Sequence, residues 1–212
     1  MNDVGPDSDA PQCRLYLITP EQLDPKSFRD ILAAALDAGD VACVQLRLKN
    51  ISDDDILRAA ETLCPVAQAR EVAFLLNDRP DLARQAGCDG VHVGQDDWSY
   101  KKARELVGPG GIVGVTCHDS RHLAMEAAEQ GADYVAFGSM YASSTKPAAP
   151  PASIGRFAEV ADLGLPRCAI GGITLARAPE LIAAGADLLA VVSDLFDAPD
   201  IAARARAYAR LF

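Results

Sequence analysis

Aromatic side chains, basic side chains and long apolar runs are all scarce in this chain of 212 residues, and each scarcity excludes a class of protein. Only 6% of the residues are aromatic, so a core must come mainly from Ala, Leu, Val and Ile. No apolar run reaches the roughly 18 residues that a membrane-spanning helix needs. The first residues carry neither a basic start nor an apolar stretch, so we expect no secretion, no membrane and a cytoplasmic location.

Basic residues are outnumbered, because 20 Lys and Arg stand against 30 Asp and Glu, which gives a net charge of −10. A nucleic-acid surface needs a basic face to displace counterions from phosphates, so we expect no nucleic-acid partner. Any anionic ligand must therefore meet a local cluster of cations. The six cysteines form no C-x-x-C pair, which is typical of small buried hydrophobes in a reducing compartment.

What the chain does contain is an alternation of short apolar stretches with helical patterns. The strands that we expect are residues 14–19, 41–49, 72–76, 90–93, 112–116, 134–137, 167–170 and 188–192. The expected helices are residues 25–38, 53–70, 80–86, 100–107, 121–130, 154–162, 178–184 and a last one that runs to the C-terminus. Each of the eight strands is thus followed by a helix.

A recurring glycine–aspartate motif between helices and strands supports a closed fold. Gly39, Gly87, Gly131 and Gly185 each end a helix, and an apolar strand follows each of them after an aspartate. The spacing between these glycines is about two β-α units, which favours a single (β/α)8 TIM barrel over an open doubly wound sheet. We expect residues 13–212 to form this one barrel domain and residues 1–12, with three aspartates and two prolines, to form a flexible tail.

Polar side chains and one glycine pair lie at the C-terminal ends of the predicted strands, where the active site of such a barrel lies. In chain order they are Gln45, Arg47, Lys49, Asn77, Asp78, Asp97, Thr116, His118, Ser143, Ser144, Thr145, Lys146, Gly171, Gly172 and Ser193. Alternation along residues 41–49 places Val41, Cys43, Gln45, Arg47 and Lys49 on one face, which we expect in the lumen. Ala42, Val44, Leu46 and Leu48 form an apolar face that meets the helices. A barrel turns the first face into the lumen, whereas an ordinary half-exposed strand would turn it to water.

Two anion sites are predicted on this rim. Asp78 and Asp97 end neighbouring strands and suit a shared Mg²⁺, although helix capping or solvation is the alternative for either carboxylate. Cations surround this pair, which suits a metal-bound polyphosphate. A second site, for a monophosphate, is expected where Gly172 and Ser193 end the last two strands, although glycine pairs also occur as plain turns.

Three further features of the sequence carry expectations about the site and the core. The connection at residues 138–151 is longer than most and is interpreted as a lid, with a solvated loop as the alternative. His118 and His122 are spaced to share a metal, but His118 more plausibly lines the pocket. His92 lies inside a strand and is expected to be a hydrogen-bonded core residue.

Nine motifs in order carry a resemblance that covers nearly the whole chain from residue 14. They are L-Y-L-I-T, V-Q-L-R-L-K, L-L-N-D-R, D-G-V-H-V-G-Q-D-D, G-V-T-C-H, G-A-D-Y-V-A-F-G, S-S-T-K, A-I-G-G-I-T and A-V-V-S. With them the chain resembles the thiamine phosphate synthase family. The resemblance implies a (β/α)8 barrel that joins hydroxymethylpyrimidine pyrophosphate to thiazole phosphate with Mg²⁺ and releases pyrophosphate.

Position by position, the resemblance also implies roles for the rim residues. The pyrimidine pyrophosphate would be held by Gln45, Arg47, Lys49, Asn77, Thr116 and Lys146, of which Arg47, Lys49 and Lys146 would be catalytic. Asp78 and Asp97 would bind Mg²⁺, and the thiazole phosphate would be held by Ser143, Ser144, Thr145, Gly172, Val192 and Ser193. Two departures are present, because Thr116 replaces the more usual serine and Ser139–Ala142 replaces a glycine-proline start of the lid.

Other functions compete with this interpretation. A thiazole tautomerase would use His118 as its acid-base group, and it would not need the full metal and pyrophosphate set. A non-catalytic binder would hold both phosphorylated ligands and yield no product. A phosphosugar isomerase or aldol-type barrel fits less well, because the second strand offers no carboxylate for proton abstraction. Self-association into a homo-oligomer stays open.

Overall fold

Eight parallel strands close into a barrel in the computed structural model, which describes residues 13–142 and 151–212. The strands are β1 (Arg14–Ile18), β2 (Val41–Leu46), β3 (Ala73–Asn77), β4 (Gly90–Val93), β5 (Ile112–His118), β6 (Tyr134–Phe137), β7 (Arg167–Ile170) and β8 (Leu188–Val191). Each strand pairs with its neighbours in chain order, and β8 returns to β1. The expected single (β/α)8 barrel is therefore confirmed, whereas residues 1–12 lie outside the described part.

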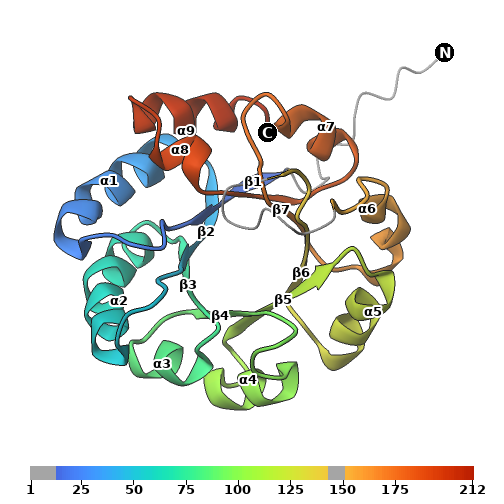
Figure 1. The fold of residues 1–212 in the computed structure, drawn as a ribbon, viewed down its shortest axis with the longest axis horizontal. Coiled ribbons are helices and arrows are strands. Elements are labelled where there is room, and N and C mark those ends of the chain that lie inside the picture. The colour runs from blue at the N-terminus through green and yellow to red at the C-terminus, as the bar shows by residue number, and fades with distance from the viewer. Residues whose placement is uncertain (1–12, 143–150) are drawn as a thin grey trace.

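Helices form a ring outside the strands (Figure 1). They are α1 (Pro25–Ala38), α2 (Asp53–Gln68), α3 (Pro80–Gln85), α4 (Tyr100–Val107), α5 (Arg121–Gln130), α6 (Arg156–Glu159) with the 3-10 turn η1 (Ala161–Leu163), α7 (Ala178–Ala183), α8 (Ser193–Phe196) and α9 (Ile201–Ala209). Side-chain caps fix where several of them begin: Asp24, Ser52, Ser99, Ser120 and Asp200 each accept a first-turn backbone N–H. No described helix is long and apolar enough to cross a membrane.

Three aspartates of the recurring glycine–aspartate motif form hydrogen bonds between neighbouring strands. Asp89, Asp133 and Asp187 precede β4, β6 and β8, and each carboxylate accepts a backbone N–H from the start of the preceding strand. The three donors are Phe74, Val113 and Arg167, at 2.7, 2.7 and 2.8 Å. An unpaired amide at a strand end would lose a hydrogen bond on burial, so each aspartate stabilises the strand before its own. The repeated motif therefore joins alternate pairs of strands at the end opposite the predicted site.

The core has two layers, as alternation along barrel strands requires. A large outer layer lies between strands and helices and includes Leu15, Val44, Phe74 and Phe137. A small inner layer fills the lumen with Tyr16, Ile18, Cys43, Leu75, Tyr134, Ala136, Cys168 and Ala190. All six cysteines are free thiols, and five of them are buried, as expected for small hydrophobes.

The second strand differs from the prediction at both ends. It ends at Leu46, so Arg47 and Lys49 lie in the β2–α2 loop, and strand alternation no longer sets their direction. At its start, Leu15 pairs with Val41 but Tyr16 pairs with Cys43, so the register slips by one residue. Because such an irregularity interrupts the alternation, Val41 packs in the outer layer instead of sharing the lumen with Cys43.

Other boundaries differ by a few residues. The fifth strand continues to His118, and the predicted last helix is two helices, α8 and α9. The helix expected at residues 154–162 is shorter and gives way to η1. Pro179 lies in the first turn of α7, where a missing backbone N–H costs nothing.

Candidate active site

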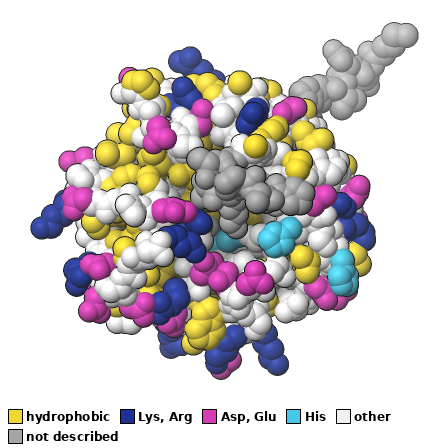
Figure 2. Space-filling model, viewed as in Figure 1, with side chains coloured by type: hydrophobic (Ala, Val, Ile, Leu, Met, Phe, Trp, Pro, Cys, Tyr) yellow, Lys and Arg dark blue, Asp and Glu magenta, His cyan; other side chains and the backbone are white. Residues whose placement is uncertain are grey.

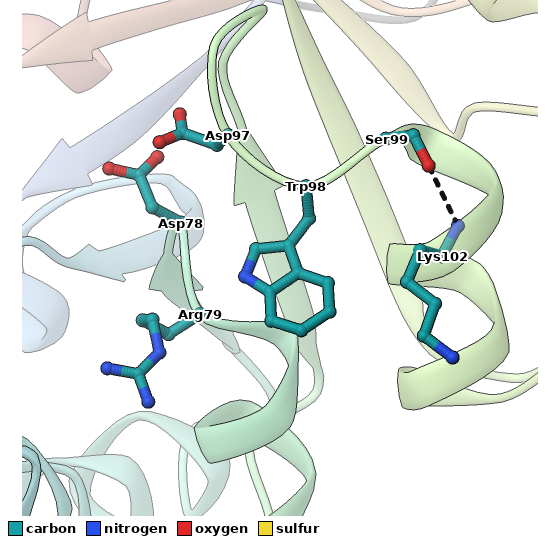
Figure 3. Close-up of a pocket in the computed structure, with 6 residues that line it drawn as sticks. All are labelled: Asp78, Arg79, Asp97, Trp98, Ser99 and Lys102. Atoms are coloured by element: carbon teal, nitrogen blue, oxygen red, sulfur yellow. Dashed lines mark hydrogen bonds between the residues drawn. The ribbon is translucent and has the colours of Figure 1, made fainter.

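Lys49, Asn77, Asp78 and Asp97 meet at the C-terminal ends of β2, β3 and β4. The Asp78 Oδ2 atom accepts hydrogen bonds from Lys49 Nζ at 2.9 Å and from Asn77 Nδ2 at 2.5 Å. The Asp97 carboxyl accepts the Gly94 N–H at 3.1 Å, which holds the β4–α4 loop in a tight turn. The carboxyl groups of Asp78 and Asp97 point toward each other (Figure 3). Three strand ends thus converge on one pair of carboxylates.

The carboxyl of Asp97 is perturbed by its surroundings. Loss of solvent raises the pKa of Asp97, and the charge of Asp78 and a hydrogen bond with it raise that pKa further. Two smaller effects lower the pKa of Asp97, namely the hydrogen bond from the Gly94 N–H and the charge of Lys49. A carboxyl whose ionisation is disfavoured by a neighbouring carboxylate gains from a cation placed between the two, and one or two carboxylates are the usual protein ligands of Mg²⁺. The donor set therefore fits the predicted metal.

A cavity of about 510 Å³ opens beside the carboxylate pair. Its lining is Asp78, Arg79, Asp97, Trp98, Ser99 and Lys102, and the indole of Trp98 lies between the Arg79 and Lys102 side chains (Figure 3). Both cations already have partners, since Arg79 pairs with Asp53 and Asp81 and Lys102 pairs with Glu105. Both cationic side chains are thus held by acidic partners at the edge of this cavity.

Charges of both signs are mixed on this molecule, as its surface view shows. Asp and Glu side chains lie next to Lys and Arg side chains over the visible face, instead of gathering in one large field of either sign (Figure 2). Arg47 follows this pattern, because its guanidinium forms an ion pair with Glu21 while its backbone N–H donates to Thr19 Oγ1 at 2.9 Å. An anionic ligand that recruits Arg47 must therefore compete with Glu21.

Gln45 and Thr116 face the lumen and are joined through three other side chains. Gln45 Nε2 donates to Tyr16 Oη, and Tyr16 Oη lies 2.8 Å from Tyr134 Oη. His92 bridges onward, with Nδ1 2.7 Å from Tyr134 Oη and Nε2 2.8 Å from Thr116 Oγ1. His92 is thus the hydrogen-bonded core residue that was expected. Gln45 is only 2% exposed, so its side chain lies inside the barrel.

The predicted phosphate end lies on the other side of the barrel. Gly172 follows β7 in the left-handed conformation (φ +63°), and a Cβ there would lie 2.8 Å from the Ala142 carbonyl oxygen. Val192 packs against the inner layer, and Ser193 is exposed as the first residue of α8. The Asp194 carboxylate accepts the Leu175 N–H at 3.1 Å, which joins the β7–α7 loop to α8. The structure therefore brings the three described residues of this predicted site onto adjoining loops.

A cation–π contact fixes the start of the predicted lid to this site. The Arg177 guanidinium carbon lies 4.4 Å from the centre of the Tyr141 ring, and Arg177 Nη1 donates to the Gly172 carbonyl at 2.7 Å. Tyr141 also hydrogen bonds to Glu180 through its hydroxyl. Burial, followed by Glu180, raises the pKa of Tyr141 to about 12, so its hydroxyl stays protonated at neutral pH. These contacts were not foreseen from the sequence.

Four predicted site residues, Ser143, Ser144, Thr145 and Lys146, lie outside the described residues. The two remaining rim histidines are described. His118 ends β5 with an exposed side chain and a positive φ of 50°, and His122 pairs with Glu126 at 3.5 Å. Within residues 13–142 and 151–212, no three His, Cys, Asp or Glu side chains are grouped to hold a metal.

Tyr16 and Tyr134 are the functional candidates that sequence reasoning missed. Each sits in an otherwise apolar strand, and a buried phenol needs a hydrogen-bond partner, which is the signal that was available. The partners come from strands far apart in sequence, since the two tyrosines are 118 residues apart. Alternation alone identifies neither partner.

Comparison with known proteins places this geometry in a family. The model of the family described as thiamine monophosphate synthase matches residues 15–195. A thiamine-phosphate synthase of Rhodospirillum centenum is 60% identical over 190 residues, which cover 88% of this chain and 91% of that protein. Another, from Marinobacter nauticus, is 48% identical over 93% of this chain and 90% of its own length.

Solved structures agree with this similarity. A thiamine phosphate pyrophosphorylase from Pyrococcus furiosus superposes with a TM-score of 0.82 at 27% identity, over 95% of this chain and 96% of that one. A 3-hexulose-6-phosphate synthase gives a TM-score of 0.69 at 20% identity, over 94% of this chain and 99% of that one. The second likeness concerns the barrel fold alone.

Proposed function

The chain belongs to the thiamine monophosphate synthase family, and we propose that it joins hydroxymethylpyrimidine pyrophosphate to thiazole phosphate, forming thiamine phosphate and pyrophosphate. The observation that carries this proposal is the match over residues 15–195 together with the facing carboxylates of Asp78 and Asp97 beside Lys49. The relatives reported above are named synthases, which supports bond formation over isomerisation at His118.

The reaction that we propose is dissociative. The bond between the pyrimidine methylene carbon and the pyrophosphate oxygen breaks first, and the pyrophosphate leaves with the electron pair. The thiazole nitrogen then donates its lone pair to the resulting pyrimidine-methyl cation, and the new C–N bond forms. No proton has to be removed in the bond-forming step, so the reaction needs preplaced charge and not a general base. Electrostatic stabilisation of this kind is typically the largest catalytic term.

Each rim residue has a proposed task in this reaction. Lys49 supplies positive charge close to the carboxylate pair, as its 2.9 Å contact with Asp78 Oδ2 supports. Arg47 contacts the pyrophosphate when it exchanges Glu21 for phosphate oxygens. Asn77 orients the Asp78 carboxylate through its amide, and Lys146 is assigned to the same pyrophosphate. Gln45 and Thr116 hold the pyrimidine end.

The carboxylate pair is the proposed Mg²⁺ site. Asp78 and Asp97 would hold the ion, which when bound supplies positive charge to the pyrophosphate oxygens. The raised pKa of Asp97 supports this assignment, because a nearby cation would favour the ionised carboxylate that the folded chain otherwise disfavours. The thiazole phosphate is assigned to the second end of the barrel mouth, at Ser143, Ser144, Thr145, Gly172, Val192 and Ser193.

The test combines purified protein with both substrates and Mg²⁺, in parallel with a sample that contains a chelator. We expect thiamine phosphate and pyrophosphate to appear in equal amounts and only with the metal. Isomerisation of the thiazole alone, without metal, would instead indicate a tautomerase. Binding of both ligands without any product would indicate a phospholigand binder.

A further inference from the structure

Glu21, in the loop between β1 and α1, is tied to the β2–α2 loop by two different groups. Its carboxylate forms an ion pair with the Arg47 guanidinium, and its backbone carbonyl accepts the Lys49 N–H at 3.2 Å. Arg47 and Lys49 are the two described cations that we assign to the pyrophosphate. A carboxylate, which repels an anion, thus lies against one of the proposed anion-binding groups.

The position of Glu21 is fixed by the residues on both sides of it. Thr19 is 1% exposed, and its hydroxyl accepts the Arg47 N–H at 2.9 Å. Pro20 restricts its own φ and also the backbone of the residue before it. On the other side, the Asp24 side chain caps the start of α1. Because both ends of this short loop are held, Glu21 reaches Arg47 without a large loss of backbone freedom.

The two side chains of the ion pair differ in their exposure to solvent. The Arg47 side chain is 18% exposed, whereas that of Glu21 is 46% exposed. The guanidinium is therefore the more enclosed partner, and the carboxylate is the one that can turn into water. A guanidinium binds a carboxylate and a phosphate with the same planar set of N–H donors. Phosphate oxygens can thus take the place of the Glu21 carboxylate on Arg47.

The second cation of this loop has a carboxylate partner of a different kind. Lys49 pairs with Asp78 at 2.9 Å, and Asp78 belongs to the carboxylate pair assigned to Mg²⁺. A bound divalent cation would offset the charge of Asp78, so Asp78 can stay in place when pyrophosphate binds. Glu21 comes from another loop and has no assigned task in holding the metal or a substrate. Its charge therefore opposes pyrophosphate without compensation.

We propose that Glu21 is a positioning residue that competes with pyrophosphate for Arg47 and thereby speeds release of this product. Pyrophosphate displaces the carboxylate from the guanidinium on binding, and the carboxylate returns as pyrophosphate leaves. The inference rests on the proposed function, because it concerns the second product of that reaction. Glu21 lies in none of the nine motifs that carry the family resemblance.

A site that stabilises departing pyrophosphate also retains it after the bond has broken. The same cations favour both the leaving group and the free product, and product release limits turnover in many enzymes. An internal carboxylate weakens binding of the anion in proportion to the fraction of time for which it occupies the guanidinium. Solvent-exposed ion pairs make modest contributions, so we expect this competition to change the Kd for pyrophosphate about three- to sixfold.

The first arm of the test is isothermal titration calorimetry of pyrophosphate into the protein at a fixed Mg²⁺ concentration, without turnover. We expect Glu21→Gln and Glu21→Ala each to lower the Kd about three- to sixfold. The same two replacements at Glu61, which is exposed on α2, change the net charge equally and should leave the Kd at the wild-type value. An unchanged Kd in both Glu21 variants, or an equal fall in the Glu61 variants, would overturn the proposal.

The second arm is a double-mutant cycle that asks whether Glu21 acts through Arg47. Arg47→Gln alone should raise the Kd, because a phosphate contact is lost. Adding Glu21→Gln to that variant should change the Kd less than about twofold, because no guanidinium is left to compete for. The same tightening with and without Arg47 would indicate a general effect of charge and would overturn the proposal. Wild-type protein that binds no pyrophosphate would contradict the proposed function itself, and the inference with it.

Discussion

Asp78 combines its predicted role with an unusual backbone conformation. Its φ is +60°, in the left-handed region, where aspartate and asparagine occur more readily than most residues. The conformation turns the chain directly after β3 and presents the carboxylate to Asp97 (Figure 3). His118 adopts a similar φ of 50° directly at the end of β5. Both of these strand ends thus carry a polar residue of the predicted rim in the left-handed conformation.

The Asp78→Asn variant tests the proposed metal site without disturbing this turn, because asparagine tolerates the same backbone conformation. We expect turnover at saturating substrate to fall about 100-fold or more, since one of the two anionic ligands and its electrostatic effect are lost. The half-saturating Mg²⁺ concentration should rise in the same variant. A coupled assay of pyrophosphate release, run over a range of Mg²⁺ concentrations, measures both quantities.

The control for this variant is Asp96→Asn. Asp96 is exposed and immediately precedes Asp97, so its replacement makes the same change of charge in the same loop. Wild-type turnover and Mg²⁺ dependence are expected for it. Equal activities of Asp78→Asn and Asp96→Asn would remove the carboxylate pair from the mechanism.

Helices α2 and α3 are joined by one residue at the edge of the site. Arg79 follows Asp78 and pairs with Asp53 in the first turn of α2 at 2.5 Å and with Asp81 in the first turn of α3 at 2.7 Å. Hydrogen bonding with Arg79 is the main cause that lowers the pKa of Asp81 and of Asp53. Arg79 therefore contributes to stability through electrostatics between the two helices.

Replacing Arg79 with Gln should make the stability less dependent on pH. Because the folded-state pKa of Asp81 is lowered, its stabilisation is present above the ordinary carboxyl pKa and is lost as pH falls through the lowered value. The side chains of the Arg79–Asp81 pair are 30% and 36% exposed, so solvent screens the pair and we expect a loss below about 1 kcal/mol at neutral pH. That corresponds to at most about 2–4 °C in Tm. Thermal unfolding across an acid-to-neutral pH series measures it.

The Arg58→Gln variant provides the comparison, since Arg58 pairs with Asp55 inside α2. We expect its effect on Tm at neutral pH to be smaller than that of Arg79→Gln. The difference between wild type and Arg79→Gln should vanish at acid pH. A constant difference at every pH would mean that Arg79 acts through packing and not through its charge.

The junction of the β7–α7 loop with the start of the lid depends on Gly172. The Gly172→Ala variant combines a left-handed φ of +63° with a contact of 2.8 Å to the Ala142 carbonyl oxygen, so this junction must shift. We expect the KM for thiazole phosphate to rise about tenfold or more, since small displacements of binding groups are costly. Initial rates at varied thiazole phosphate measure this.

Gly87→Ala is the matched control for the strain alone. Gly87 also has a left-handed φ, of +68°, but an added Cβ would meet no atom within 4 Å. We expect both variants to lose about 1 kcal/mol of stability, the usual cost of this conformation for alanine. Only Gly172→Ala should change the KM, and an equal change in both would show that general destabilisation is responsible.

At the scale of the whole molecule, the barrel closes around the stacked rings of its lumen. We expect Gly114→Ala to cost about 1–3 kcal/mol or more, because the added Cβ would lie 1.9 Å from Tyr134 Cζ in a packed interior. Each 1 kcal/mol lowers Tm by roughly 2–4 °C in a chain of this size. Calorimetric unfolding of Gly110→Ala gives the baseline, since no atom lies within 4 Å of a Cβ there. Similar Tm values for the two variants would contradict a rigid lumen.

Much of the barrel and its rim could be predicted from the chain. The helix at residues 25–38 has its predicted bounds, and the glycine-aspartate punctuation correctly indicated eight strands in a closed order. Lys49, Asn77, Asp78 and Asp97 do meet, because consecutive strands of a parallel barrel place their ends side by side. The metal and the substrate contacts stay predictions until the assays are done.

The remaining differences have specific causes. Val41 packs in the outer layer and not in the lumen, because the β1–β2 register shifts by one residue. Such a shift depends on the neighbouring strand as much as on the strand itself. The Glu21 partner of Arg47 lies in the preceding loop, whose course no periodicity describes. Such features arise from pairing between segments.

The sequence by itself determined which stretches become strands and helices, because burial on one face imposes a period of 2 or 3.6 on neighbouring residues. It also determined which polar residues stand at strand ends. Tertiary structure alone decided that Gln45 reaches Thr116 through Tyr16, Tyr134 and His92, since these side chains meet only when the barrel closes. Hydrogen bonds between residues as many as 118 positions apart leave no periodic trace in the chain.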